Sequence, residues 1–222
     1  MFQLYDHLLQ FQLFQGLSRT ELLQLAGSTK FGFHTEPTGR TLVSEGDACR
    51  QLFFLIKGRL ELTTRSADGG YRLTEQLSAP WLLQPEALFG PSPVYSSNCR
   101  TLGNCQLITL SKDEVLRLLD DFLIIRLNLL NLLALLTQRR RQLQWRSAPQ
   151  SLRERFVRFL AARSAYPAGP KQLHILMTRL AQELGCNRLS VSQMLNQLQG
   201  DELLQLHRGR IDVPSLERLL QG

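Results

Sequence analysis

The chain has 222 residues, 43% of them hydrophobic, and a formal net charge of +7. This length permits one large or two modest domains with real cores, and the composition excludes a disordered or fibrous protein. The N-terminus lacks the charged segment, apolar segment and cleavage site of a secretory signal, so we expect a cytoplasmic protein.

The first third of the chain predicts one helix followed by short strands. Within residues 13–27, Ser18 is the expected helix N-cap because Glu21 completes a capping box. Short apolar runs then alternate with Gly, Pro, Ser and Asp clusters, which is typical of a small antiparallel barrel or sandwich. The predicted strands are Thr41–Val43, Leu52–Ile56, Leu60–Thr64, Tyr71–Gln76 and Gln106–Leu110, with turns at Gly46, Gly58 and Gly69-Gly70.

A leucine-rich segment follows. Ser111 and Glu114 form a second capping signal, and the helical pattern continues to about Trp145. Its most apolar run, 122–136, is too short for a membrane span, which needs about 20 apolar residues, so no membrane partner is expected. A small barrel cannot cover so apolar a helix, and we expect it to form a homodimer seam. The alternative is a helix buried within one chain. The seam leucines are predicted to be Leu129, Leu132, Leu133 and Leu136.

The segment 180–199 reads as helix, tight turn and second helix. Gly185 permits the left-handed backbone of the turn, and Asn187 can cap the second helix. Val191, Met194, Leu195 and Leu198 recur at helical spacing, whereas Arg188, Ser192, Gln193 and Asn196 form a polar face able to bind bases or phosphates. This is the pattern of a helix-turn-helix, although two amphipathic helices of an ordinary domain would share it.

Two further features favour DNA as the partner. Residues 203–213 predict a hairpin that turns at Arg208-Gly209, and a hairpin behind a recognition helix is a wing. Its tip carries His207, Arg208 and Arg210. The charge excess is C-terminal: residues 1–136 hold 12 basic and 13 acidic side chains, whereas residues 137–222 hold 14 and 6. Such asymmetry is typical of a nucleic-acid-binding half joined to a neutral half.

The residue types required for metal or cluster chemistry are sparse. The four cysteines, Cys49, Cys99, Cys105 and Cys186, contain no CxxC pair, so no zinc or iron–sulfur framework is predicted. We expect free cysteines that pack as small hydrophobic residues, rather than a redox pair of Cys99 and Cys105. An enzyme or metal-binding cupin would need histidines, and residues 40–110 contain none. We therefore predict no catalytic residue, no metal site and no cofactor.

Taken in order, these segments resemble the CRP/FNR family of bacterial regulators. The similarity rests on LFxGLSxxELxxLA (13–26), EGD (45–47), LFFLIKGRLEL (52–62), the leucine-rich helix, LGCNRxSVSxxL (184–195) and RGRI (208–211). The resemblance implies an α+β fold: an N-terminal cupin-like β-roll similar to cyclic nucleotide-binding domains, a long central dimerisation helix and a C-terminal winged helix-turn-helix. The expected boundaries are 1–120, 121–147 and 148–222, with a hinge at Ala148-Pro149. It also implies a homodimeric transcription regulator on palindromic double-stranded DNA, with RNA polymerase as a partner.

The effector segment departs from the cyclic-AMP type of this family. In that type, a Gly-Glu pair opens a short helix and an Arg-Ser pair clamps the cyclic phosphate. Here Gln84-Pro85 and Tyr95-Ser96 occupy those places, so an amide donor and the bidentate arginine are missing. We therefore expect an effector other than cyclic AMP: a small carboxylate such as 2-oxoglutarate, or no ligand at all. The candidate pocket residues are Glu86, Ala87, Leu88, Tyr95, Ser96, Arg100, Arg140 and Arg141.

Arg140 and Arg141 stand where the cyclic-AMP type has two small hydroxyl residues, and Arg139 extends them to a cluster of three. A related nitrogen-control regulator holds 2-oxoglutarate with arginines. The alternative is that this cluster is solvated or pairs with a partner chain. The oxygen-sensing branch needs an N-terminal cysteine cluster, which residues 1–30 lack. In the recognition helix, Leu189 and Gln193 replace the usual Glu and Arg, so the operator should differ from the well-known half-sites. The predicted DNA-binding residues are Thr178, Arg188, Leu189, Ser190, Ser192, Gln193, Asn196, Arg208 and Arg210.

Overall fold

The computed structural model describes residues 2–145 and 147–221 and divides the chain into two compact units. The first unit comprises residues 1–60 and 78–139, and the second comprises residues 61–77 and 140–222. A segment from the strand-rich half of the sequence, residues 61–77, therefore belongs to the C-terminal unit. The sequence pattern did not indicate this exchange.

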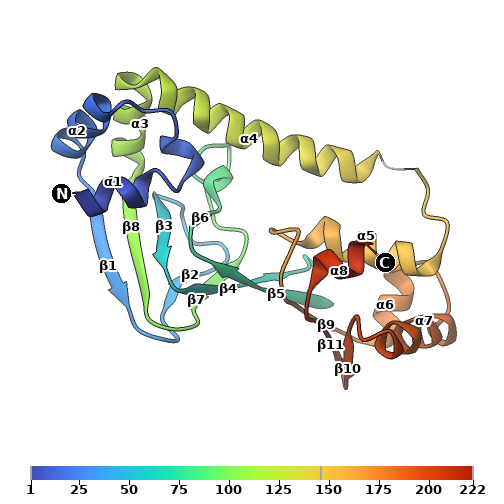
Figure 1. The fold of residues 1–222 in the computed structure, drawn as a ribbon. Helices are drawn as coiled ribbons and strands as arrows, with labels where there is room; N and C mark the ends of the chain where they lie inside the picture. Colours follow the sequence, from blue (N-terminus) through green and yellow to red (C-terminus); the bar gives the residue numbers. More distant parts are fainter. Residues whose placement is uncertain (1, 146, 222) are drawn as a thin grey trace. The chain divides into compact units, whose positions relative to one another are not determined.

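The first unit contains a four-stranded antiparallel sheet in the order β1-β8-β3-β6 and the paired strands β2 and β7. Helices gather at one end of the four-stranded sheet (Figure 1). Its elements are α1 (Phe2–Leu8), the 3-10 helix η1 (Gln12–Phe14), α2 (Arg19–Ser28), β1 (Gly32–Glu36), β2 (Thr41–Val43), β3 (Gln51–Lys57), β6 (Trp81–Leu83), the 3-10 helix η2 (Pro85–Ala87), β7 (Asn98–Thr101), β8 (Cys105–Ser111) and α3 (Lys112–Asp121).

Local signals explain most of these elements. The Ser18 hydroxyl accepts a hydrogen bond from the Glu21 N–H, and the Glu21 carboxylate accepts one from the Ser18 N–H, which confirms the predicted capping box. All five predicted strands are present, whereas β1, β6 and β7 were not predicted. The core includes Phe54, whose ring lies 5.0 Å from that of Phe11 in an edge-to-face arrangement.

The leucine-rich segment is two helices rather than the single one that the sequence predicts. After α3, Phe122 is buried with extended backbone (φ −125°, ψ 103°), and α4 runs over Leu123–Gln144. Arg126 donates from Nε to the Leu119 carbonyl at 2.6 Å, which satisfies a free carbonyl at the end of α3. Asn128 donates to the carbonyls of Leu13 and Gln15. Arg126 and Asn128, the polar residues at the start of α4, thus stabilise the interruption between α3 and α4 and hold the first turns of α4 in place.

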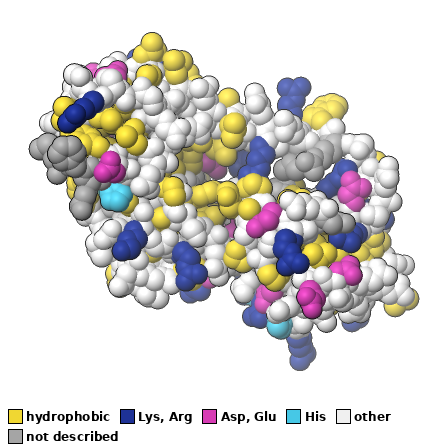
Figure 2. Space-filling view, viewed as in Figure 1, with side chains coloured by type: hydrophobic (Ala, Val, Ile, Leu, Met, Phe, Trp, Pro, Cys, Tyr) yellow, Lys and Arg dark blue, Asp and Glu magenta, His cyan; other side chains and the backbone are white. Residues whose placement is uncertain are grey.

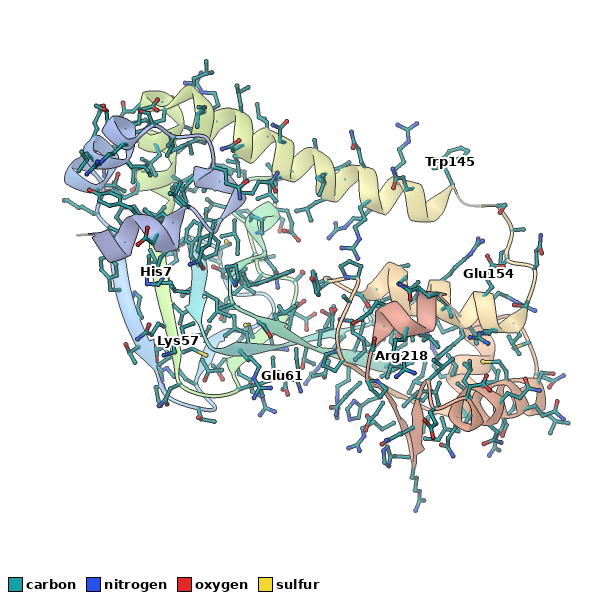
Figure 3. The ribbon with its side chains drawn as sticks, viewed as in Figure 1. His7, Lys57, Glu61, Trp145, Glu154 and Arg218 are labelled. Atoms are coloured by element: carbon teal, nitrogen blue, oxygen red, sulfur yellow. The ribbon has the colours of Figure 1, made fainter. Side chains whose placement is uncertain are left out.

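The second unit is a helical domain that packs on a sheet. Its strands follow the order β10-β11-β9-β5-β4. Residues 61–77, which form the hairpin of β4 and β5 and are called the exchanged hairpin below, join this sheet because β5 pairs with β9. The Ser151 hydroxyl caps α5 by accepting from the Glu154 backbone at 3.1 Å (Figure 3 labels Glu154). Its further elements are β4 (Arg59–Arg65), β5 (Tyr71–Ser78), α5 (Leu152–Arg163), β9 (Lys171–Ile175), α6 (Met177–Glu183), α7 (Arg188–Gly200), β10 (Gln205–His207), β11 (Arg210–Val213) and α8 (Leu216–Gln221).

Candidate nucleic-acid interface and effector segment

Helices α6 and α7 meet at a tight turn. Gly185 has φ +61°, and the Cys186 N–H donates to the Ala181 carbonyl at 3.0 Å, which closes the end of α6. Asn187 caps α7 by accepting from the Ser190 backbone at 2.8 Å. The sequence missed Arg155 of α5, which donates to the Leu184 carbonyl at 2.8 Å and so holds the turn.

Helix α7 has one buried and one solvent-facing side. Its buried residues are Val191, Met194, Leu195 and Leu198, as the sequence predicts. The exposed side carries Arg188, Leu189, Gln193 and Asn196, while Ser190 and Ser192 are half-buried. Thr178 is exposed in the first turn of α6. Mostly polar side chains therefore cover the exposed face of α7, on the side opposite its buried residues, as a helix in a DNA groove requires.

The hairpin behind α7 turns at Arg208-Gly209, where Gly209 has φ +73°. Arg208 is exposed at the tip. The sequence predicts that Arg210 is available to bind DNA, but its Nε lies 3.0 Å from one carboxylate oxygen of Asp212. His207 Nε2 lies 3.2 Å from the second carboxylate oxygen of Asp212. Asp212 therefore offsets part of the positive charge at the base of this wing.

The exchanged hairpin is fastened to the second unit by polar contacts that no sequence motif indicated. Glu75 of β5 and Lys171 of β9 form an ion pair at 3.0 Å, and both side chains are fully buried. Glu75 also accepts from the Ala165 backbone at 2.8 Å, and Lys171 donates to the Ala168 carbonyl at 2.8 Å. Near the hairpin turn, Arg179 of α6 lies 2.6 Å from Asp68. The hairpin thus contacts the first helix of the helix-turn-helix.

In the effector segment, residues 84–96, the side chain of Gln84 accepts both hydrogen bonds that Ser96 can donate. Gln84 Oε1 accepts from the Ser96 backbone at 2.9 Å and from the Ser96 hydroxyl at 3.1 Å. Gln84 adopts a left-handed conformation (φ 38°) and is nine-tenths buried. Tyr95 is also buried and donates to the Gln51 carbonyl at 2.9 Å. Burial raises the pKa of the Tyr95 hydroxyl far above its usual range, so this group stays neutral.

The other candidate effector residues are spread over both units. Ala87 and Leu88 are buried at the end of η2, Glu86 is half-buried and Arg100 is exposed on β7. Arg140 and Arg141 are exposed on α4, in its part that belongs to the second unit. Cys49, Cys99 and Cys105 are buried and form no disulfide bond. Within residues 2–145 and 147–221, no group of three or more His, Cys, Asp or Glu side chains could hold a metal ion.

Comparison with known proteins agrees with these two halves. A family model described as a cyclic nucleotide-binding domain matches residues 35–122, and a Crp-like helix-turn-helix domain matches residues 154–221. The chain belongs to the CRP/FNR family. Members of the CRP/FNR family are DNA-binding transcription regulators, a class of proteins that are not enzymes.

Individual CRP/FNR relatives are distant in sequence. The cAMP-activated global transcriptional regulator CRP of Pasteurella multocida is 25% identical over 185 residues, which cover 78% of this chain and 86% of the relative. The catabolite activator protein of Thermus thermophilus has a TM-score of 0.50 at 20% identity, over 95% of this chain and 97% of that one. A CRP/FNR regulator from Eubacterium rectale has a TM-score of 0.51 at 17% identity, over 96% and 97%. The two structures confirm the predicted fold class.

The described part of this CRP/FNR chain contains no helix that is both long and apolar enough to cross a membrane.

Proposed function

We propose that this CRP/FNR regulator binds palindromic operators as a homodimer, with α7 in the major groove and the wing on the adjacent backbone. The observation that carries the proposal is the exposed polar face of α7 behind a capped turn. Arg188 supplies a bidentate donor for guanine, Gln193 suits adenine, and Leu189 can pack on a thymine methyl. Thr178, Ser190, Ser192, Asn196, Arg208 and Arg210 complete the proposed contact set.

Selection of bound duplexes from a random library, followed by fluorescence anisotropy, tests this assignment. We expect an inverted repeat with half-site centres about 34 Å apart. Truncation of Arg188 should relax the preference at one position in each half-site. Equal losses on operator and random DNA for that variant would show that Arg188 contacts the backbone instead of a base.

The proposed dimer seam is the outer face of α4. Leu123, Leu127 and Leu130 lie at helical spacing and are 63%, 47% and 57% exposed. Leu129, which the sequence assigns to the seam, is instead buried in its own chain, and Leu132, Leu133 and Leu136 are half-buried. Exposed leucines in one stripe are costly in water, and a second α4 would cover them.

We also propose that the site where the cyclic-AMP type binds the cyclic phosphate is occupied in this chain by the side chain of Gln84. A cyclic phosphate bound there would need the Ser96 donors, and Gln84 already accepts from both. In the cyclic-AMP type an arginine that clamps the phosphate precedes the serine, whereas here that position is the buried, neutral Tyr95. This arrangement supports a regulator that does not respond to cyclic AMP, and it favours the ligand-free alternative at this segment.

Isothermal titration with cyclic AMP and 2-oxoglutarate tests the effector proposal. We expect no heat from cyclic AMP with the wild type. Binding of 2-oxoglutarate that is lost in Arg140→Gln/Arg141→Gln would establish the carboxylate alternative, whereas silence from both ligands would support ligand independence. Tight cyclic-AMP binding would contradict the role given to Gln84. The proposal also includes RNA polymerase as a partner and a cytoplasmic location.

A further inference from the structure

Basic side chains form a row across the sheet of the second unit. Arg72 of β5 lies opposite His174 of β9, His174 opposite Arg210 of β11, and Arg210 opposite His207 of β10. Residues that lie opposite each other in antiparallel strands share a face of the sheet. Four strands therefore present one line of arginine and histidine side chains.

The row continues onto β4. Thr63 Oγ1 lies 3.1 Å from Thr74 Oγ1, and the Ser66 N–H donates to the Tyr71 carbonyl at 3.0 Å. The same register places Arg65 opposite Arg72. The sheet row, defined as Arg65, Arg72, His174, Arg210 and His207, thus crosses five strands.

This row lies on the face that is turned away from the hydrophobic core. The neighbouring register line, Leu73, Leu173 and Ile211, is buried on the opposite face among the core residues of the second unit. Arg65 and Arg72 are exposed. In the space-filling view, basic side chains and a histidine lie beside acidic side chains at the edge of the unit where Figure 1 labels β10 and β11 (Figures 1 and 2).

The electrostatics of the row favour an anion. Burial, followed by the positive charges of Arg72 and Arg210, lowers the pKa of His174, while Asp212 and Glu61 oppose this shift (Figure 3 labels Glu61). Asp212 pairs with His207 and Arg210 and so neutralises one charge of the row. Arg65, Arg72 and Arg210 face Asp212 and Glu61, so three positive charges against two negative ones leave an excess of one positive charge on this face.

We propose that the sheet row is a second DNA contact, which binds backbone phosphates of the duplex outside the half-site read by α7. The proposal rests on the proposed function, because the row begins at the wing and continues its surface. Four strand spacings of about 4.8 Å give a length of about 19 Å. That length corresponds to about six base pairs at about 3.4 Å each. A flat sheet face suits backbone phosphates better than base edges, which lie inside the grooves.

The exchanged hairpin gives this contact a specific consequence. Arg65 and Arg72 come from residues 61–77, yet the pairing of β5 with β9 places them beside the wing strands. DNA bound along the row would therefore contact the hairpin as well as the C-terminal domain. Flanking DNA should then stabilise the pairing of β5 with β9.

The test compares a minimal operator, obtained by selection, with one extended by about six base pairs on each side. For the wild type, we expect tighter binding to the longer duplex and a steeper salt dependence, because each phosphate contact contributes a slope of about 0.9. If Arg65 and Arg72 each contact one phosphate, the ratio of the affinities for the duplex with and without one flank should fall about tenfold when the salt concentration rises about fourfold. Arg65→Gln/Arg72→Gln should remove this gain and leave binding to the minimal operator unchanged.

Neutral methylphosphonates in the flanks provide a second measurement. They should weaken wild-type binding and have no effect on Arg65→Gln/Arg72→Gln, because the variant no longer uses those charges. Arg19→Gln/Arg50→Gln is the matched control, since it removes the same charge from exposed positions outside the row. This control should keep the full gain from the flanks.

The outcomes separate the two proposals. A wild type that binds the minimal operator and gains nothing from the flanks would overturn the sheet row and leave the proposed function intact. The same conclusion follows if Arg65→Gln/Arg72→Gln keeps the gain. A wild type that binds no duplex in a salt-dependent manner would overturn the proposed function itself.

Discussion

The buried ion pair between Glu75 and Lys171 should dominate the stability of the second unit. In Lys171→Met the apolar side chain fills a similar volume, but the Glu75 carboxylate loses its countercharge at 3.0 Å while both positions stay fully buried. Removing one partner of a buried pair costs about 3–5 kcal/mol, because an uncompensated charge remains in a medium of low dielectric. The Ala165 and Tyr166 N–H groups still donate to Glu75, but two neutral donors do not replace an ammonium group.

This cost converts into a measurable shift. For a chain of 222 residues, about 1 kcal/mol corresponds to about 2–4 °C in Tm, so Lys171→Met should lower the Tm by about 6–20 °C. The double variant Glu75→Gln/Lys171→Met buries no charge, and its new amide oxygen can still accept from the Ala165 N–H. We expect the double variant to lie within about 2 kcal/mol of the wild type, since replacing a whole buried pair is often close to neutral.

Urea unfolding followed by circular dichroism gives the free energies of unfolding, and hydrogen exchange locates the change. In Lys171→Met the amides of β5 and β9 should lose protection first, because the pair joins these two strands. The reasoning would be refuted if Lys171→Met cost less than about 1 kcal/mol, or if the double variant were as unstable as the single one. Either result would mean that Glu75 is not an isolated charge in the variant.

Three further predictions concern the dimer, the DNA and the pH. Leu127→Asp/Leu130→Asp should be monomeric by sedimentation velocity, because it places charges in the exposed stripe of α4. Arg188→Ala should cost about 1–3 kcal/mol on the operator and less on random DNA, whereas Arg208→Ala should weaken both equally and lower the salt slope by about 0.9. His174 has a lowered pKa in the folded state, so the unfolded chain binds more protons as the pH falls below about 6.5. Stability should therefore decline with acidification through that range, and less so in His174→Gln.

Each of these predictions has its own control. Leu176→Asp introduces a charge at an exposed leucine outside the α4 stripe and should leave the oligomeric state unchanged. A wild type that sediments as a monomer at micromolar concentration would remove the basis of the seam. An Arg208→Ala variant that discriminates between sequences would reassign the wing tip to base reading. Parallel pH profiles for the wild type and His174→Gln would show that another group controls the acid response.

Short-range sequence signals are enough to predict the local architecture of the DNA-binding half. The cap at Asn187, the left-handed Gly185 and the alternating faces of α7 depend on residues within a few positions of one another. Helical spacing and capping chemistry can be read from such short segments. The capping box at Ser18 and the wing turn at Gly209 were predictable for the same reason.

The contacts between distant segments depend on how the whole chain folds. The pattern of residues 71–76 predicts a strand but names no partner, and only the fold pairs it with β9 and buries Glu75 against Lys171. The end of α3 at Phe122 depends on burial of that ring and on Arg126, not on a helix-breaking residue. Gln84 reaches Ser96 because the chain folds back between them. A strand can form its backbone hydrogen bonds and bury its apolar face against any compatible strand. Which strand it pairs with therefore depends on the packing of the whole chain.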